Sequence, residues 1–83
     1  MKMRRRSDGS IGDAYLYQGL FKPLPHWLSD SSKVRKHTAE KPMEVQIITG
    51  RWWAVHANDW IIKHGDDLWL IDDSDVNQTH EEI

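Results

Sequence analysis

Two apolar runs separated by a short polar link form the clearest pattern in the chain. Trp60–Ile62 and Leu68–Ile71 flank a polar segment that contains Gly65. Trp and Ile favour the pleated, half-buried surface of a sheet, and Gly can adopt the positive φ that a tight turn often needs. The pattern predicts a β-hairpin, and we expect residues 57–71 to organise the rest of the chain.

A period-two alternation near the N-terminus predicts a further strand over residues 11–20. Tyr15 and Tyr17 would share one face of this strand, and Ala14 and Leu16 would share the other.

A short helix is predicted to follow. Pro25 suits the first helical position, because the N–H that proline lacks would be unpaired there. Leu24, Trp27 and Leu28 then fall on one apolar face, which we expect to pack on the sheet. Residues 29–42 contain few apolar side chains and are predicted to be a long exposed loop.

Two more strands are predicted over residues 43–48 and 52–56, joined by a turn at Gly50. Adjacent side chains on a strand point to opposite faces of the sheet. Either the sheet is covered on both faces at Trp52 and Trp53, or one of the two indoles is exposed.

The chain as a whole is predicted to be a small α+β protein. Its mainly antiparallel sheet would have four to five strands, with one short packed helix and a C-terminal helical turn capped by Asp73 or Ser74. The basic, polar residues 1–10 are expected to form a flexible arm, and residues 11–83 a single domain that ends in an extended tail over residues 80–83.

The composition of the chain excludes several kinds of site. The chain has 83 residues, five Trp and no Cys, so disulfides, thiolate metal sites and thiol nucleophiles are excluded. No apolar run approaches the roughly 20 residues of a membrane span, and no apolar segment follows the basic start, so we expect a cytoplasmic protein.

The charge is divided unevenly along the chain. Residues 1–43 hold nine Lys/Arg and four Asp/Glu, which gives +5, whereas residues 44–83 hold two and nine, which gives −7. A division of this kind bears on partners and not on fold.

The predicted hairpin and the segment that follows it resemble a known family. Residues 57–62 read Ala-Asn-Asp-Trp-Ile-Ile, Gly65 and an apolar strand follow, and residues 73–81 read Asp-Ser-Asp-Val-Asn-Gln-Thr-His-Glu. This order resembles small phage and prophage accessory proteins of the PGDYG type. Those proteins carry a Pro-Gly-Asp-Tyr/Trp-Ile-Ile motif and a closing Asp-x-Phe-x-x-Thr-Tyr-Glu motif. The resemblance is close over residues 43–83 and loose over residues 11–30.

The sequence departs from the family pattern at several positions. Ala57-Asn58 replaces Pro-Gly, Val76 stands where Phe is usual, and His80 stands where Tyr is usual. The resemblance implies a fold and a viral origin, which would place the protein in a host cytoplasm. It implies no enzymatic chemistry.

Catalytic and metal sites are weakly indicated. His56, Asp59, His64, Asp66 and Asp67 lie close in sequence, but their spacing matches no established ligand pattern. No nucleophile motif is visible. We therefore expect no catalytic residue, no metal and no cofactor.

Protein binding is the function that the sequence favours. Trp and Arg are enriched in interaction hot spots, and carboxylates can occupy the basic groove of a protein that handles nucleic acid. The expectation is a non-catalytic phage accessory protein that binds a host protein, plausibly as an inhibitor of a defence complex of the anti-CRISPR kind. The expected contact residues are Arg51, Trp52, Trp53, Asp66, Asp67, Asp72, Asp73 and Asp75.

The alternative is a small nucleic-acid-binding module that uses the basic arm and the loop over residues 33–41. Its phosphate contacts would be Arg4, Arg5, Arg6, Lys33, Arg35 and Lys36. The acidic C-terminal half argues against this alternative, because it would repel a phosphate backbone.

Overall fold

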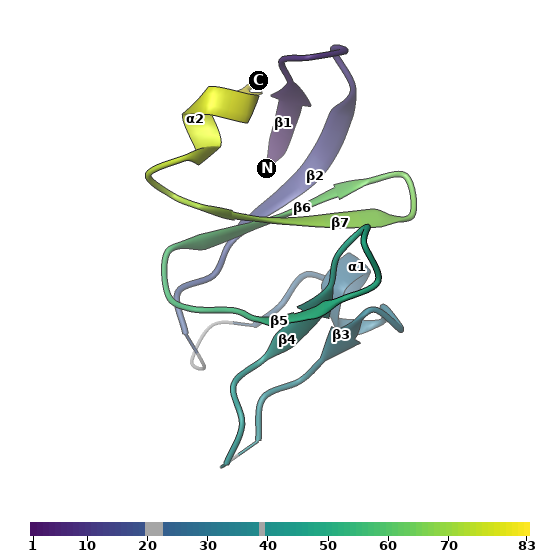
Figure 1. Ribbon diagram of the computed structural model, residues 1–83, viewed down its shortest axis with the longest axis vertical. Helices are drawn as coiled ribbons and strands as arrows, with labels where there is room; N and C mark the ends of the chain where they lie inside the picture. Colours follow the sequence, from purple (N-terminus) through teal and green to yellow (C-terminus); the bar gives the residue numbers. More distant parts are fainter. Residues whose placement is uncertain (20–22, 39) are drawn as a thin grey trace.

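The hairpin of strands β6 and β7 is the centre of the fold (Figure 1). The computed structural model describes residues 1–19, 23–38 and 40–83. Strand β6 (Asp59–His64) and strand β7 (Asp67–Asp72) pair antiparallel along their whole length, and Gly65 has a φ of +60° in the turn between them. The hairpin predicted from the two apolar runs is confirmed.

A five-stranded antiparallel sheet is built on this hairpin. Its strand order is β7-β6-β2-β1-β8, with β2 at Ile11–Leu16, β1 at Lys2–Arg5 and β8 at His80–Glu82. Strand β1 pairs with β2 on one side and with β8 on the other. The prediction of a flexible arm over residues 1–10 is therefore wrong, and the extended tail over residues 80–83 is part of the sheet.

The burial pattern of β1 explains this correction. Met3 is buried, whereas Lys2 and Arg4 on either side are exposed. A single apolar residue among basic neighbours has too little alternation to predict a strand. The strand is held by its backbone pairing with β2 and β8, which no local pattern reveals.

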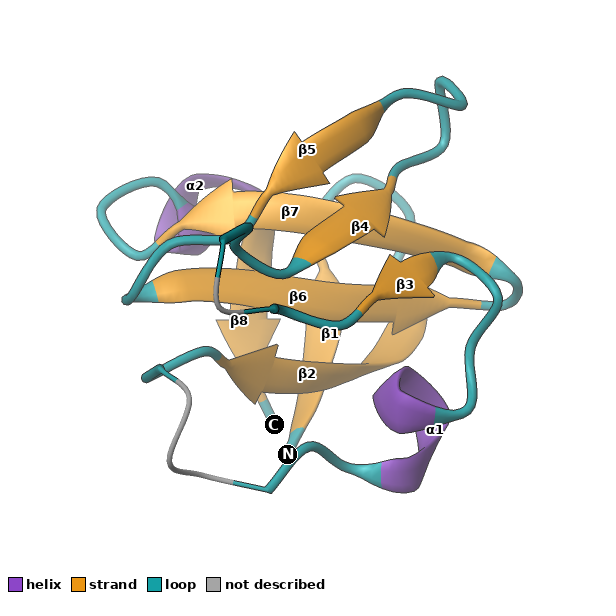
Figure 2. Cartoon of the chain, turned by 90° about the horizontal axis from the view of Figure 1, so that it is seen from below, coloured by secondary structure: helices purple, strands orange, loops and turns teal. Residues whose placement is uncertain are grey.

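A second, three-stranded sheet lies below the hairpin in Figure 1 and passes across it when the molecule is seen from below (Figure 2). Its order is β3-β4-β5, with β3 at Val34–Arg35, β4 at Glu44–Gln46 and β5 at Trp52–Ala54. Strand β3 lies inside residues 29–42, where an exposed loop was predicted; Ala39 in that segment is outside the described residues. The α+β class with antiparallel pairing is confirmed, but the described residues form eight strands in two sheets, not one sheet of four to five.

Helix α1 (His26–Ser29) begins directly after Pro25, which is its N-cap and not its first helical residue. Leu28 is fully buried, and Leu24 and Trp27 pack against the same core, so the predicted apolar face is confirmed.

Helix α2 (Val76–Thr79) forms the predicted C-terminal turn. Its N-cap is Asp75, so it begins later than the predicted caps Asp73 and Ser74. Residues 20–22, which include the end of the predicted first strand, lie outside the described residues.

The hairpin buries side chains on both faces, because successive residues of a strand point to opposite sides. One face contributes to the second-sheet cluster: Tyr17, Leu28, Met43, Val45, Val55, Ile61 and Leu68. The other face contributes to the terminal-strand cluster: Met3, Ala14, Trp60, Ile62 and Val76. Tyr15 packs on the first cluster and Leu16 on the second, as the predicted alternation requires.

Candidate functional site

Two exposed apolar side chains lie in the turn after β4 and on strand β5. Ile48 is 56% exposed and Trp53 is 48% exposed. Gly50, with a φ of +85°, closes the turn, and its N–H donates to the Ile47 carbonyl at 2.8 Å. We call the end of the sheet that carries Ile48, Arg51, Trp52 and Trp53 the β4–β5 tip.

The exposure of Trp53 follows from its place in the sheet. Trp53 lies directly opposite Val45, so both side chains are on the same face of the three-stranded sheet. Val45 is fully buried because β4 is the central strand, whereas β5 is the edge strand. The indole of Trp53 thus extends past the core at an unpaired sheet edge. Of the two outcomes predicted for this pair, the structure shows the exposed indole.

Trp52 is held in place on the opposite face of the same sheet. The guanidinium carbon of Arg35 lies 3.8 Å from the centre of the Trp52 ring, and Arg35 also forms an ion pair with Glu44 at 3.8 Å. A cation over an indole face is attractive by about 0.5–1 kcal/mol at an exposed site. The stacked pair makes the tip a preorganised surface on this side.

The predicted acidic residues do not form one surface. Asp66 and Asp67 lie at the turn of the hairpin, whereas Asp72 is the last residue of β7 and Asp73 and Asp75 follow it. A strand of this length separates its ends by about 17 Å. The two groups therefore lie about one strand length apart.

Two of these carboxylates have internal roles. Asp73 Oδ1 accepts a hydrogen bond of 2.7 Å from the Trp60 indole N–H. Asp72 Oδ1 accepts from the backbone N–H and the hydroxyl of Ser74, both at 2.9 Å, and these bonds lower the pKa of Asp72. Both groups fix the chain as it leaves β7.

Most of the predicted phosphate contacts are also paired within the protein. Arg4 and Arg6 reach Glu81 at 3.3 and 3.5 Å. Arg5 forms an ion pair with Asp8 at 2.6 Å, and this hydrogen bond holds the pKa of the Asp8 carboxyl far below its usual range. The three arginines are cross-strand and turn partners, not a free basic arm.

The other three predicted contacts lie on or next to the second sheet. Arg35 is stacked and ion-paired as described, and Lys33 Nζ donates to the backbone carbonyl of Asp66. Lys36 is exposed, and no side-chain partner is found for it among the described residues. The structure therefore spreads the six cations over both sheets and does not gather them on one face.

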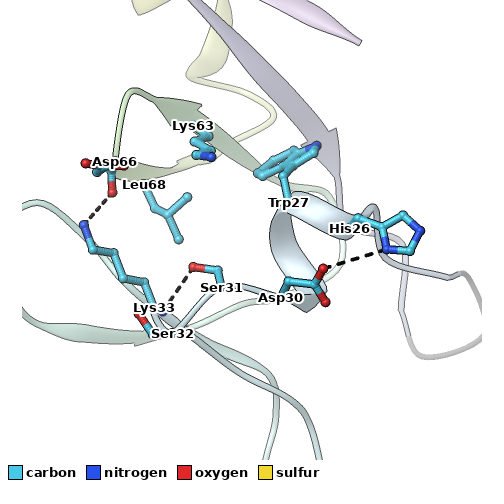
Figure 3. A pocket seen from close by; sticks show the side chains of 9 residues that line it. All are labelled: His26, Trp27, Asp30, Ser31, Ser32, Lys33, Lys63, Asp66 and Leu68. Atoms are coloured by element: carbon cyan, nitrogen blue, oxygen red, sulfur yellow. Dashed lines mark hydrogen bonds and ion pairs between the residues drawn. The ribbon is translucent and has the colours of Figure 1, made fainter.

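An open cleft lies between α1 and the β6–β7 hairpin (Figure 3). It has a volume of about 660 Å³ and is lined by His26, Trp27, Asp30, Ser31, Ser32, Lys33, Lys63, Asp66 and Leu68. We call it the α1 cleft. Of these residues only Lys33 and Asp66 were among the predicted contact residues. One feature of the sequence could have indicated this cleft. Lys63 is a cation on the inward face of β6, the face that also carries Ile61.

A buried histidine pair lies on the other side of the hairpin. His64 Nε2 and His80 Nε2 are 2.9 Å apart, and their rings are stacked. Gly12 leaves room for the His64 ring, since a Cβ there would lie only 3.0 Å from ring atoms Cε1 and Nδ1. The alternation of β6 already places His64 on the face of Trp60 and Ile62, but nothing local points to His80.

This pairing separates the residues weighed as metal ligands. His56 lies 3.8 Å from Asp59 at one end of β6, while His64 is at the other end with His80. Across residues 1–19, 23–38 and 40–83, no three His, Asp or Glu side chains are arranged to hold a metal ion.

Comparison with family models finds no match, and comparisons with curated proteins and with solved structures find none either. None of the helices in the described part of the chain is long and apolar enough to cross a membrane.

Proposed function

We propose that this protein is a non-catalytic accessory protein of phage origin that binds a host protein through the β4–β5 tip. Within this class, an inhibitor of a host defence or nucleic-acid-handling complex, of the anti-CRISPR kind, is the sharpest form of the proposal. The observation that carries it is the half-exposed indole of Trp53 on the edge strand β5, together with the exposed side chain of Ile48 in the turn that precedes this strand.

The chemistry of the tip suits a protein partner. The apolar surface of an aromatic side chain at a sheet edge is removed from water only when a partner covers it. Trp is one of the residues that are enriched at binding hot spots. Arg51 is exposed next to the indole and has no side-chain partner among the described residues. The complementary surface is an apolar pocket with a carboxylate at its rim.

Internal pairing of the arginines supports protein binding over the nucleic-acid alternative. Arg4, Arg5, Arg6 and Arg35 each already have a carboxylate partner. A phosphate backbone would have to displace these carboxylates, which reduces the gain from each contact.

The test is capture of partners from nuclease-treated lysate of a bacterial host with the tagged protein as bait. We expect a discrete, saturable partner that is retained by the wild type and lost in the double variant Ile48→Ser/Trp53→Ser. Ile11→Ser is the matched control, because Ile11 is also 56% exposed but lies on the other sheet.

Two results would contradict the proposal. One is a set of captured proteins that is the same for the tip variant and the wild type. The other is capture that disappears after nuclease treatment, which would return the function to nucleic-acid binding. Circular dichroism of each variant confirms that a lost partner does not reflect a lost fold.

A further inference from the structure

Lys63 is the unusual charge in the α1 cleft. It lies directly opposite Asp13 on the neighbouring strand, which is the arrangement of a cross-strand ion pair. Asp13 instead pairs with Lys2. No partner for the Lys63 ammonium is found among the described residues, and Figure 3 shows its side chain in the cleft beside Trp27.

The other wall of the cleft adds polar groups with spare hydrogen-bonding capacity. Lys33 donates one hydrogen bond to the Asp66 backbone carbonyl, which leaves its positive charge uncompensated by that contact. The Ser31 hydroxyl accepts from the Lys33 backbone N–H at 3.1 Å and keeps its own proton to donate. The Asp30 carboxylate lies near His26 instead, with 3.9 Å between Oδ2 and the imidazole Nδ1.

An aromatic surface completes the cleft. Trp27 is partly buried on α1, and the buried side chain of Leu68 also lines the cleft. Any of the nucleobases can stack on an indole, because every base has a π-face. The cleft is open, and its volume of about 660 Å³ is sufficient to admit a small organic ligand.

We propose that the α1 cleft binds a nucleotide, with its base on Trp27 and its phosphate on Lys63. This site is separate from the β4–β5 tip and goes beyond the proposed function. Asp30 and Asp66 leave the cleft without a net positive charge, so a singly phosphorylated nucleotide fits better than a triphosphate. The nucleotide can be free or part of a single strand.

The test is to titrate the 83-residue chain with nucleoside monophosphates. Binding is monitored through the indole N–H resonances in a two-dimensional NMR spectrum. We expect saturable binding that shifts the Trp27 resonance, with triphosphates binding more weakly. A short single-stranded oligonucleotide is titrated in parallel. Tighter binding of the oligonucleotide identifies a strand as the source, and preference for the monophosphate identifies a free nucleotide.

Four variants locate the site. Lys63→Gln and Trp27→Leu should each weaken binding about ten-fold or more, because one removes the charged donor and the other the stacking surface. Lys41→Gln and Trp53→Leu are the matched controls, an exposed lysine and an exposed tryptophan outside the cleft, and should bind as wild type. Melting curves of each variant check that it is folded, and Lys63→Gln should be folded even if Trp27→Leu is not, because Trp27 packs against the core whereas Lys63 is not part of it.

Three outcomes overturn the proposal: no saturable binding at millimolar concentration, binding unchanged in Lys63→Gln, or binding lost only in Lys41→Gln. The last would assign nucleic acid to the exposed loop. Failure of the tip as a protein-binding surface leaves these outcomes unchanged, because neither Ile48 nor Trp53 lines the cleft.

Discussion

The two faces of the β6–β7 hairpin are buried by different means. On the second-sheet side, Ile61 and Leu68 pack among apolar side chains such as Leu28 and Val45. On the terminal-strand side, the apolar cluster is accompanied by a buried histidine pair and by the indole hydrogen bond from Trp60. The second-sheet side is stabilised mainly by the packing of these side chains, whereas stability on the terminal-strand side also depends on protonation and on specific acceptors.

Removal of Trp60 should have the largest effect on stability. Trp60 is 8% exposed and contacts the terminal-strand cluster, so Trp60→Ala leaves a cavity and is expected to lower the free energy of unfolding by about 3–5 kcal/mol. Denaturant unfolding monitored by circular dichroism measures it. A loss below about 1 kcal/mol would contradict the central place of the hairpin in this fold.

Acidification should destabilise the terminal-strand side selectively. Burial, followed by the positive charge of Arg5, lowers the pKa of His64, and burial followed by His64 and Arg5 lowers the pKa of His80. Asp8 opposes both shifts. The unfolded chain therefore takes up more protons than the folded one as the pH falls through about 6.5, and folding stability decreases there.

The slope of this loss is up to about 1.4 kcal/mol per pH unit for each histidine. Unfolding free energies measured between pH 8 and pH 5 should fall more steeply for the wild type than for His80→Gln, in which one titrating group is absent. His37→Gln, a change at an exposed histidine, should keep the wild-type profile. Identical profiles for all three proteins would show that the buried pair does not control the pH dependence.

Loss of one acceptor should have a smaller effect. Asp73→Ala leaves the buried Trp60 N–H without its 2.7 Å partner and is expected to cost about 1–2 kcal/mol. Asp73→Asn keeps an acceptor oxygen and should recover most of that loss. Asp75→Ala is the matched control, because no side-chain hydrogen bond of Asp75 caps α2. Equal stability of Asp73→Ala and Asp75→Ala would rule out a structural role for Asp73.

The two sides of the hairpin also differ in how much of their structure the sequence predicts. The hairpin and the two faces of β2 are local patterns, so Trp60, Tyr15 and Ala14 were placed correctly. Strands β1 and β8 pair residues such as Arg4 and Glu81 that are 77 positions apart, and each strand alone reads as a charged tail. Strand β3 has two residues, too few for any alternation to be visible.

The candidate site was predictable to a similar extent. Adjacent tryptophans on one strand required opposite faces, but which indole is exposed depends on β5 being an edge strand, and that is a property of the whole sheet. The acidic contact residues were predicted without any indication of how far apart they lie. Asp67 and Asp72 are the first and last residues of β7, and an extended chain covers more distance per residue than any other regular structure.

Trp53→Ser should have the smallest effect on stability and thereby separates binding from folding. Because the indole is 48% exposed at a sheet edge, its removal is expected to change the unfolding free energy by no more than about 0.5 kcal/mol. Trp60→Ala in the same assay is the reference for a buried indole. A loss in Trp53→Ser as large as that of Trp60→Ala would mean that Trp53 is retained for packing. A near-neutral change would favour partner binding as the reason for an exposed tryptophan on this edge strand.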